Sequence, residues 1–163
     1  MDAPHLSVEI SDLQSHLRID PAAVVDLARR VLEAEGIGSA SISLALVDDA
    51  AIHDLNRRHL GHDWPTDVIT FGLSAPDDPE LAGEIVVSAE MAATTARAAG
   101  IDPHAELWLY VVHGLLHLCG YDDRTAGAAE AMRIREAEVL AALGLTNPFP
   151  LVGAAHSGGE MTR

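Results

Sequence analysis

The sequence predicts a single α+β domain in which a small mixed β-sheet is packed with helices. The spacing of apolar residues alternates between strand-like and helix-like along the chain. It predicts the elements strand, helix, strand, helix, strand, strand, helix, helix and helix, in that order. Helices therefore collect toward the C-terminal end, an order that favours helices packed on a mixed sheet. The chain has 163 residues, of which 48% are hydrophobic, enough to bury one core. We place the domain at residues 1–150 and expect residues 151–163, which contain Gly and Ser, to form a disordered tail.

The first half of the chain predicts two strands and two helices. Asp20 and Pro21 form an N-cap and first-turn pair that opens a helix, and Gly36 closes it. A second, shorter helix begins at a cap formed by Asp48 or Asp49. The expected elements are a weakly alternating edge strand at 5–10, a helix at 21–35, a β-branched strand at 41–47 and a helix at 50–59.

The second half predicts a pair of strands followed by three helices. Trp64-Pro65 requires extended backbone before the first of these strands. Gly100, Gly120 and Gly144 each follow an apolar helical pattern and predict helix ends. The expected elements are a strand at 68–71, a polar loop at 72–81, a strand at 83–88, a helix at 89–99, a helix opened by Asp102-Pro103, and a last helix after Thr125.

Composition predicts a soluble cytoplasmic protein with no membrane partner. No segment approaches the roughly 18–20 consecutive apolar residues of a membrane span. The N-terminus lacks the basic and apolar regions of a signal peptide. A single cysteine precludes an internal disulfide and fits a reducing compartment.

The net charge argues against a nucleic-acid partner when it is taken alone. The formal net charge is −15, and the ten basic side chains include no lysine. Proteins that bind nucleic acid usually carry basic patches, because neutralising phosphates releases counterions. An acidic chain can still bind RNA if its arginines converge on one face or if a partner supplies affinity.

The segment 108–123, WLYVVHGLLHLCGYDD, carries the strongest chemical signal. His113 and His117 are four residues apart, so they lie on one face of a helix. Two imidazoles so placed can share one ion at about 2.0–2.1 Å, the usual Zn–N distance. Gly120 ends the helix, and the following turn brings Asp123 back as a possible third ligand. Buried or surface histidines without a metal are the alternative, but two buried imidazoles lacking partners would be costly.

HGLLHLCGYDD resembles the HGxLHLxGYDH signature of the YbeY family, bacterial metal-dependent endoribonucleases implicated in ribosomal RNA maturation. The family has a third histidine at the position of Asp123, and this pattern favours Asp123 over Asp122 as the third ligand. LNRRHLGHDWPTDVITF also resembles the family block LNxxYRGxDxPTDVLSF, with Leu60 in place of an arginine associated with activity. GEIVVS at 83–88 matches the family's GDIxIS block. The resemblance covers most of 44–144 and implies the same α+β fold.

The resemblance implies a zinc-dependent endoribonuclease that cleaves single-stranded RNA in ribosomal RNA maturation and ribosome quality control. The expected partners are ribosomal RNA precursors and the ribosome or its proteins, and the expected cofactor is one Zn²⁺ per chain held by His113, His117 and Asp123. Two alternatives remain open. One is a non-catalytic ribosome-associated protein whose metal is structural. The other is a metallopeptidase, which is disfavoured because Gly114 stands where HExxH enzymes have a glutamate.

We expect RNA contacts from a cluster of Arg57, Arg58 and His62, because the rest of the chain is so acidic. Arg57 lies one helical turn before Leu60, so it is a candidate to replace the family arginine; an exposed helix arginine is the alternative. The sequence does not locate a catalytic base. The acidic residues to examine for that role, or for orienting a ligand histidine, are Asp63, Asp67 and Glu84.

Overall fold

The computed structural model describes residues 5–148, and within them four strands form one mixed sheet in the order β1-β2-β4-β3. β1 and β2 are parallel, β2 and β4 are parallel, and β3 pairs with β4 as an antiparallel hairpin. β1 and β3 are therefore the edge strands. The strands are β1 (His5–Asp12), β2 (Ser39–Val47), β3 (Val68–Gly72) and β4 (Leu81–Ser88).

The helices begin where their capping residues predict. The Asp20 carboxylate accepts a hydrogen bond from the Ala22 amide at the start of α1, and Asp102 accepts one from the His104 amide at the start of α4. Asp48, rather than Asp49, caps α2. The helices are α1 (Pro21–Ala34), α2 (Asp49–Leu60), α3 (Ala89–Ala99), α4 (Pro103–Leu118) and α5 (Ala126–Ala142).

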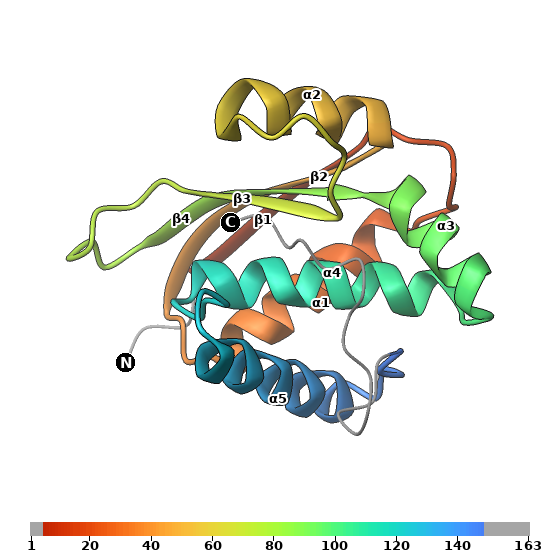
Figure 1. The fold of residues 1–163 in the computed structure, drawn as a ribbon. Helices are drawn as coiled ribbons and strands as arrows, with labels where there is room; N and C mark the ends of the chain where they lie inside the picture. The colour runs from red at the N-terminus through yellow and green to blue at the C-terminus, as the bar shows by residue number, and fades with distance from the viewer. Residues whose placement is uncertain (1–4, 149–163) are drawn as a thin grey trace.

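The helices cover the two faces of the sheet unequally (Figure 1). α2 lies alone on one face, while α1, α4 and α5 lie on the other. α4 is the central helix, since it contacts β3, β4, α1, α3 and α5. The main core lies between the sheet and α1 and α4, and a smaller apolar cluster lies beneath α2 (Val47, Ile52, Ile69 and Val86). His113 and His117 thus belong to the most enclosed helix of the fold.

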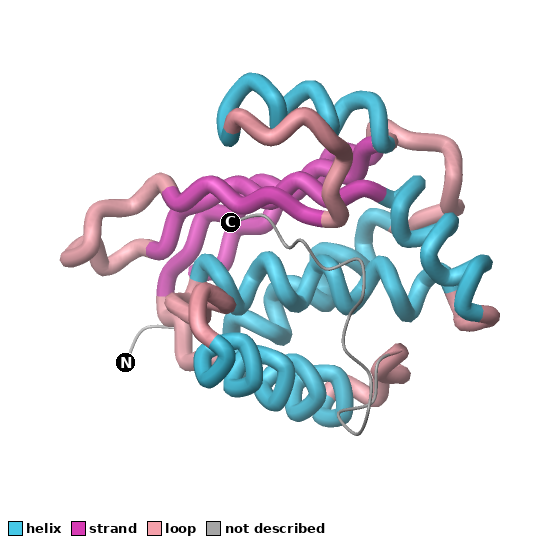
Figure 2. Tube along the Cα trace, viewed as in Figure 1, coloured by secondary structure: helices cyan, strands magenta, loops and turns pink. Residues whose placement is uncertain are grey.

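The predicted α+β class and the predicted element order are both confirmed. The loop predicted at 72–81 is shorter than expected, because the hairpin pairing continues to Gly72 opposite Gly83 and β4 starts at Leu81. This hairpin projects beyond the body of the molecule (Figure 2). The expected tail at 151–163 lies outside the described residues. Within 5–148 no helix is long and apolar enough to cross a membrane.

Candidate metal centre

One face of α4 carries a line of polar side chains through an otherwise apolar helix. Glu106, Tyr110, His113 and His117 follow the spacing i, i+4, i+7 and i+11, which places them on the same side of the helix. Glu106 and Tyr110 are fully enclosed, His113 is buried and His117 is partly exposed. The line therefore runs from the core toward solvent, with the two histidines at the accessible end.

The turn after α4 is fixed by its backbone. Gly120 has φ +112°, a left-handed conformation that favours glycine. Its amide donates to the His117 carbonyl, and the Tyr121 amide donates to the Leu116 carbonyl, which is the Schellman pattern of helix ends. The helix end predicted from Gly120 is confirmed, and Asp123 follows in a half-buried position.

The neighbouring Asp122 already serves the turn. Its carboxylate accepts a hydrogen bond from the Arg124 amide at 3.1 Å. An acceptor used in this way stabilises the turn locally. Asp122 thus has a structural role of its own in the turn.

His113 is oriented by a carboxylate from another helix. Its Nδ1 meets the Glu136 Oε2 at 2.5 Å, and both side chains are buried. A carboxylate accepts hydrogen bonds, so it places the imidazole proton on Nδ1 and leaves the Nε2 lone pair available. Ligand histidines in metal sites are commonly held by a carboxylate in this way. The arrangement fits the role of a metal ligand.

Sequence reasoning missed Glu136, which lies 23 positions after His113. A signal was nevertheless present. Met132, Glu136, Val139 and Leu140 form the buried stripe of α5, so a carboxylate occupies an otherwise apolar face. A buried charge requires a partner, and such a position should be examined for one.

An ion pair joins α1 and α5 near the turn. Arg135 on α5 donates to the Glu35 carboxylate at 2.6 Å, and burial, together with the negative charge of Glu35, raises the pKa of the Tyr121 hydroxyl in the turn. Arg135 further donates to the Ala34 carbonyl at the end of α1. The segment that leads from His117 to Asp123 therefore lies near an ion pair between α1 and α5.

The donor chemistry of His113, His117 and Asp123 suits zinc, which accepts imidazole nitrogen and carboxylate oxygen. Among residues 5–148, however, no three side chains of His, Cys, Asp or Glu converge closely enough to hold a metal in this arrangement. An ion shared by all three would have to draw their side chains together. The ligand set remains a prediction, supported by the orientation of His113.

Asp67 stands at the entry of β3, where its carboxylate accepts a hydrogen bond from the Val68 amide at 2.9 Å. This contact occupies one of its oxygens, and its orientation of a ligand histidine stays a prediction. The negative charge of Asp67 also acts on the buried phenol of Tyr110 in α4. Burial, and then the negative charges of Glu106 and Asp67, raise the pKa of Tyr110, so the phenol stays neutral.

Asp63 and Glu84 lie on the opposite side of the sheet from the α4 histidines. Asp63 contacts the His53 Nε2 at 2.9 Å on the α2 side of the sheet. Glu84 is exposed on β4, between Gly83 and Ile85, both of which face α4. Alternation along a strand then directs Glu84 to the opposite face.

The packing around Gly114 leaves no room for the glutamate that an HExxH peptidase helix carries at this position. A Cβ at this position would lie 2.8 Å from the Ile85 side chain and 3.3 Å from that of Val68. The position faces the sheet, where α4 approaches β4 too closely for any side chain. A glutamate could not act as a general base from here, so the structure disfavours the metallopeptidase alternative.

Cys119 caps the helix and is an unsuitable metal ligand. Burial, together with the negative charge of Glu35, raises the pKa of its thiol to about 12. The thiol therefore stays protonated at neutral pH, whereas metal binding needs the thiolate. Cys119 packs against the main core as a small, partly buried apolar side chain.

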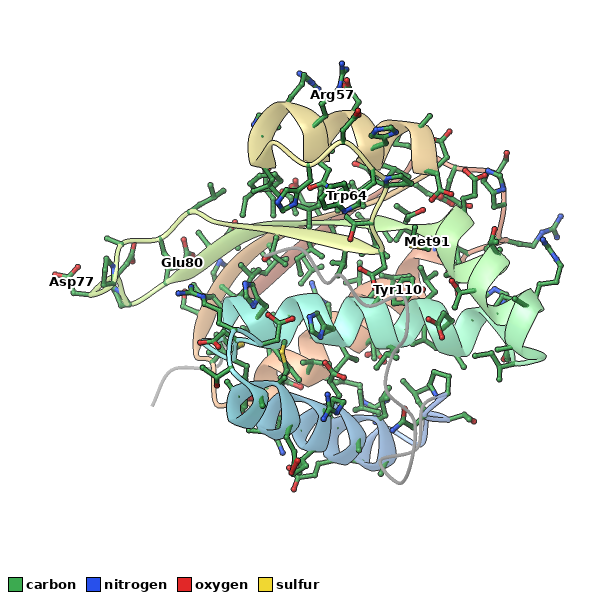
Figure 3. The ribbon with its side chains drawn as sticks, viewed as in Figure 1. Arg57, Trp64, Asp77, Glu80, Met91 and Tyr110 are labelled. Carbon is green, nitrogen blue, oxygen red and sulfur yellow. The ribbon has the colours of Figure 1, made fainter. Side chains whose placement is uncertain are left out.

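The two arginines expected to contact RNA are exposed at the last turn of α2, but both are paired. Arg57 and Arg58 share the Asp54 carboxylate at 2.8 and 2.9 Å. α2 lies on the opposite face of the sheet from α4, and Arg57 points away from the sheet (Figure 3). Leu60 instead packs against the apolar cluster beneath α2. Arg57 is therefore no geometric substitute for an arginine at position 60.

Comparison with known proteins agrees with the family signature at the end of α4. The profile of the family described as "Endoribonuclease YbeY" matches residues 9–144. The chain belongs to the endoribonuclease YbeY family. The expectation of an RNA-cleaving hydrolase is thereby confirmed at the level of the family.

Curated YbeY proteins and one solved structure resemble the chain over most of its length. The protein of Moorella thermoacetica is 44% identical over 131 residues, which cover 71% of this chain and 84% of the relative. That of Pelotomaculum thermopropionicum is 38% identical over 151 residues, covering 86% and 99%. A Thermotoga maritima protein solved in solution superposes with a TM-score of 0.57 at 27% identity, covering 91% of this chain and 99% of that one.

Proposed function

We propose that this YbeY-family protein is a zinc-dependent endoribonuclease that cleaves single-stranded RNA in ribosomal RNA precursors in the cytoplasm. Maturation and quality control of the ribosome would be its context, and the ribosome or its proteins its partners. The observation that carries the proposal is the buried contact between His113 and Glu136, because it orients a ring nitrogen as metal ligands require.

His113, His117 and Asp123 would hold one zinc ion per chain. When bound, zinc supplies a Lewis acid that polarises a phosphoryl oxygen and favours deprotonation of water. Other residues of the chain position these ligands. Glu136 fixes the tautomer and the orientation of His113, and the turn at Gly120 leads the chain to Asp123.

The proposal is tested by an RNA cleavage assay on the purified chain with zinc, with a chelator, and with zinc restored after chelation. A labelled single-stranded RNA should be cut with zinc, left intact with chelator, and cut again after zinc is restored. His117→Ala should abolish cleavage under every condition, because one of the two imidazole donors is lost. Undiminished cleavage in chelator would contradict the proposal.

A non-catalytic ribosome-associated protein with a structural metal is the second candidate. Leu60 favours it, since an apolar side chain packs where the family carries an arginine associated with activity. In that case chelation would lower the melting temperature, because a ligand of the native state stabilises it, yet no RNA would be cut with zinc present.

The exposed arginines of α2 give a separate prediction about RNA affinity. Arg57→Ala combined with Arg58→Ala should weaken RNA binding and flatten its salt dependence, because fewer phosphate contacts release fewer counterions. Since both arginines already neutralise Asp54, we expect the slope of log K against log salt to fall by about one rather than two. Titrations at several salt concentrations measure this slope, and an unchanged slope would show that RNA does not contact this end of α2.

A further inference from the structure

An exposed tryptophan stands in the segment that joins α2 to β3. Trp64 is 43% exposed, and it is the one aromatic side chain among the large hydrophobic residues exposed within 5–148 (Leu13, Trp64, Leu73 and Ile134). An exposed indole offers a large, flat apolar face to a ligand. The candidate metal centre makes no use of this ring.

The indole is held in place by a second ring. The imidazole of His62 stacks on Trp64 with ring centroids 4.8 Å apart and an angle of 8° between the planes. Asn56, fully buried in α2, fixes both residues: its side chain donates to the Trp64 carbonyl, and its own carbonyl accepts from the His62 amide. The pair is thus ordered in advance, which reduces the entropy lost when a ligand binds.

The pair lies beside the edge strand next to α4. Trp64 is placed between α2 and β3 (Figure 3). β3 is an edge strand, and its Val68 and Thr70 side chains face Gly114 of α4 on the other side of the sheet. A strand of RNA that passes over the edge of β3 can therefore reach both the Trp64 ring and the α4 side of the sheet.

We propose that the stacked pair of Trp64 and His62 is a platform for an unpaired base of single-stranded RNA. The inference rests on the proposed function and names how its substrate is held. Two parallel rings present a flat face to a third planar ring, and stacking of a base on an aromatic side chain is a common means of binding single strands.

The charge of the chain favours a stacking contact. The net charge is −15, and the exposed Arg57 and Arg58 share the Asp54 carboxylate, which offsets part of the attraction they offer to phosphates. Stacking needs no neutralisation of phosphates. The patch is also limited to one exposed indole and a half-buried imidazole, with the exposed Gly61 and Asp63 next to them in the chain, and is too small for a protein interface.

Tryptophan fluorescence tests the platform directly. The chain has two tryptophans, so Trp108→Phe leaves Trp64 as the only reporter. Titration with short phosphorothioate oligoadenylate, which resists cleavage, should quench this fluorescence. Trp64→Ala should bind the same oligonucleotide about 5-fold to 100-fold more weakly, by the same factor at low and high salt, whereas Trp64→Phe should retain part of the affinity.

The controls distinguish a failure of the stacking proposal from a failure of the proposed ribonuclease activity. Trp64→Ala should raise KM for a single-stranded RNA and leave kcat unchanged, because a stack remote from the reacting phosphate binds substrate and transition state alike. Equal loss of affinity for duplex RNA, or unchanged oligoadenylate affinity in Trp64→Ala while the wild type cleaves RNA, would overturn the platform alone. A wild type that neither binds nor cleaves RNA would overturn both proposals.

Discussion

Asp123→Ala should weaken zinc binding on the order of a hundredfold or more. Zinc bound by a full set of protein ligands gains roughly 10–16 kcal/mol, so one ligand accounts for about 3 kcal/mol, and each 1.4 kcal/mol is tenfold in affinity. Competition with a chromophoric chelator measures the constant. Asp123→His should keep zinc, because it restores the ligand type found in the family.

Asp122→Ala is the matched control for this change. Asp122 is adjacent and also acidic, but its carboxylate accepts from the Arg124 amide within the turn. Its replacement should loosen the turn and leave zinc affinity within a few fold of the wild type. Loss of zinc in Asp122→Ala, with zinc retained in Asp123→Ala, would move the third ligand to Asp122.

Glu136→Gln should lower zinc affinity about 10-fold to 100-fold although residue 136 is no zinc ligand. The amide oxygen can still accept from the His113 Nδ1, so the fold is kept, but an uncharged acceptor makes the imidazole a weaker donor to the ion. Each tenfold loss of affinity removes about 1.4 kcal/mol of metal-induced stability when zinc is in excess.

Thermal unfolding of Glu136→Gln with and without zinc checks this prediction. The melting temperature in chelator should stay near that of the wild type, and the rise on adding zinc should be smaller. Glu130→Gln, an exposed residue of the same helix, should behave as the wild type does. A full zinc-induced rise in Glu136→Gln would contradict the orienting role.

The α4 half of the site could be predicted from the sequence because its geometry is local. The i and i+4 spacing of His113 and His117, the cap at Asp102 and the left-handed Gly120 act within one helix and its ends. Each of these is visible in a short window of sequence. The same is true of the element order, which follows from local periodicity.

The parts that were missed depend on contacts between distant segments. Glu136 reaches His113 only because α5 packs beside α4, and the charge of Asp67 acts on Tyr110 only because β3 packs against α4. The placement of α2 on the opposite face separates Arg57 from the α4 histidines. The stack of His62 on Trp64 likewise requires the conformation of the α2–β3 connection. No spacing rule encodes these distances.

The central claim is that a metal ion binds at the end of α4, and elemental analysis of the purified chain tests it most directly. We predict one zinc per chain in the wild type and in Trp64→Ala, and none in the double variant His113→Ala with His117→Ala. A folded wild type that cleaves RNA without bound metal, or a double variant that retains a full equivalent of zinc, would contradict it.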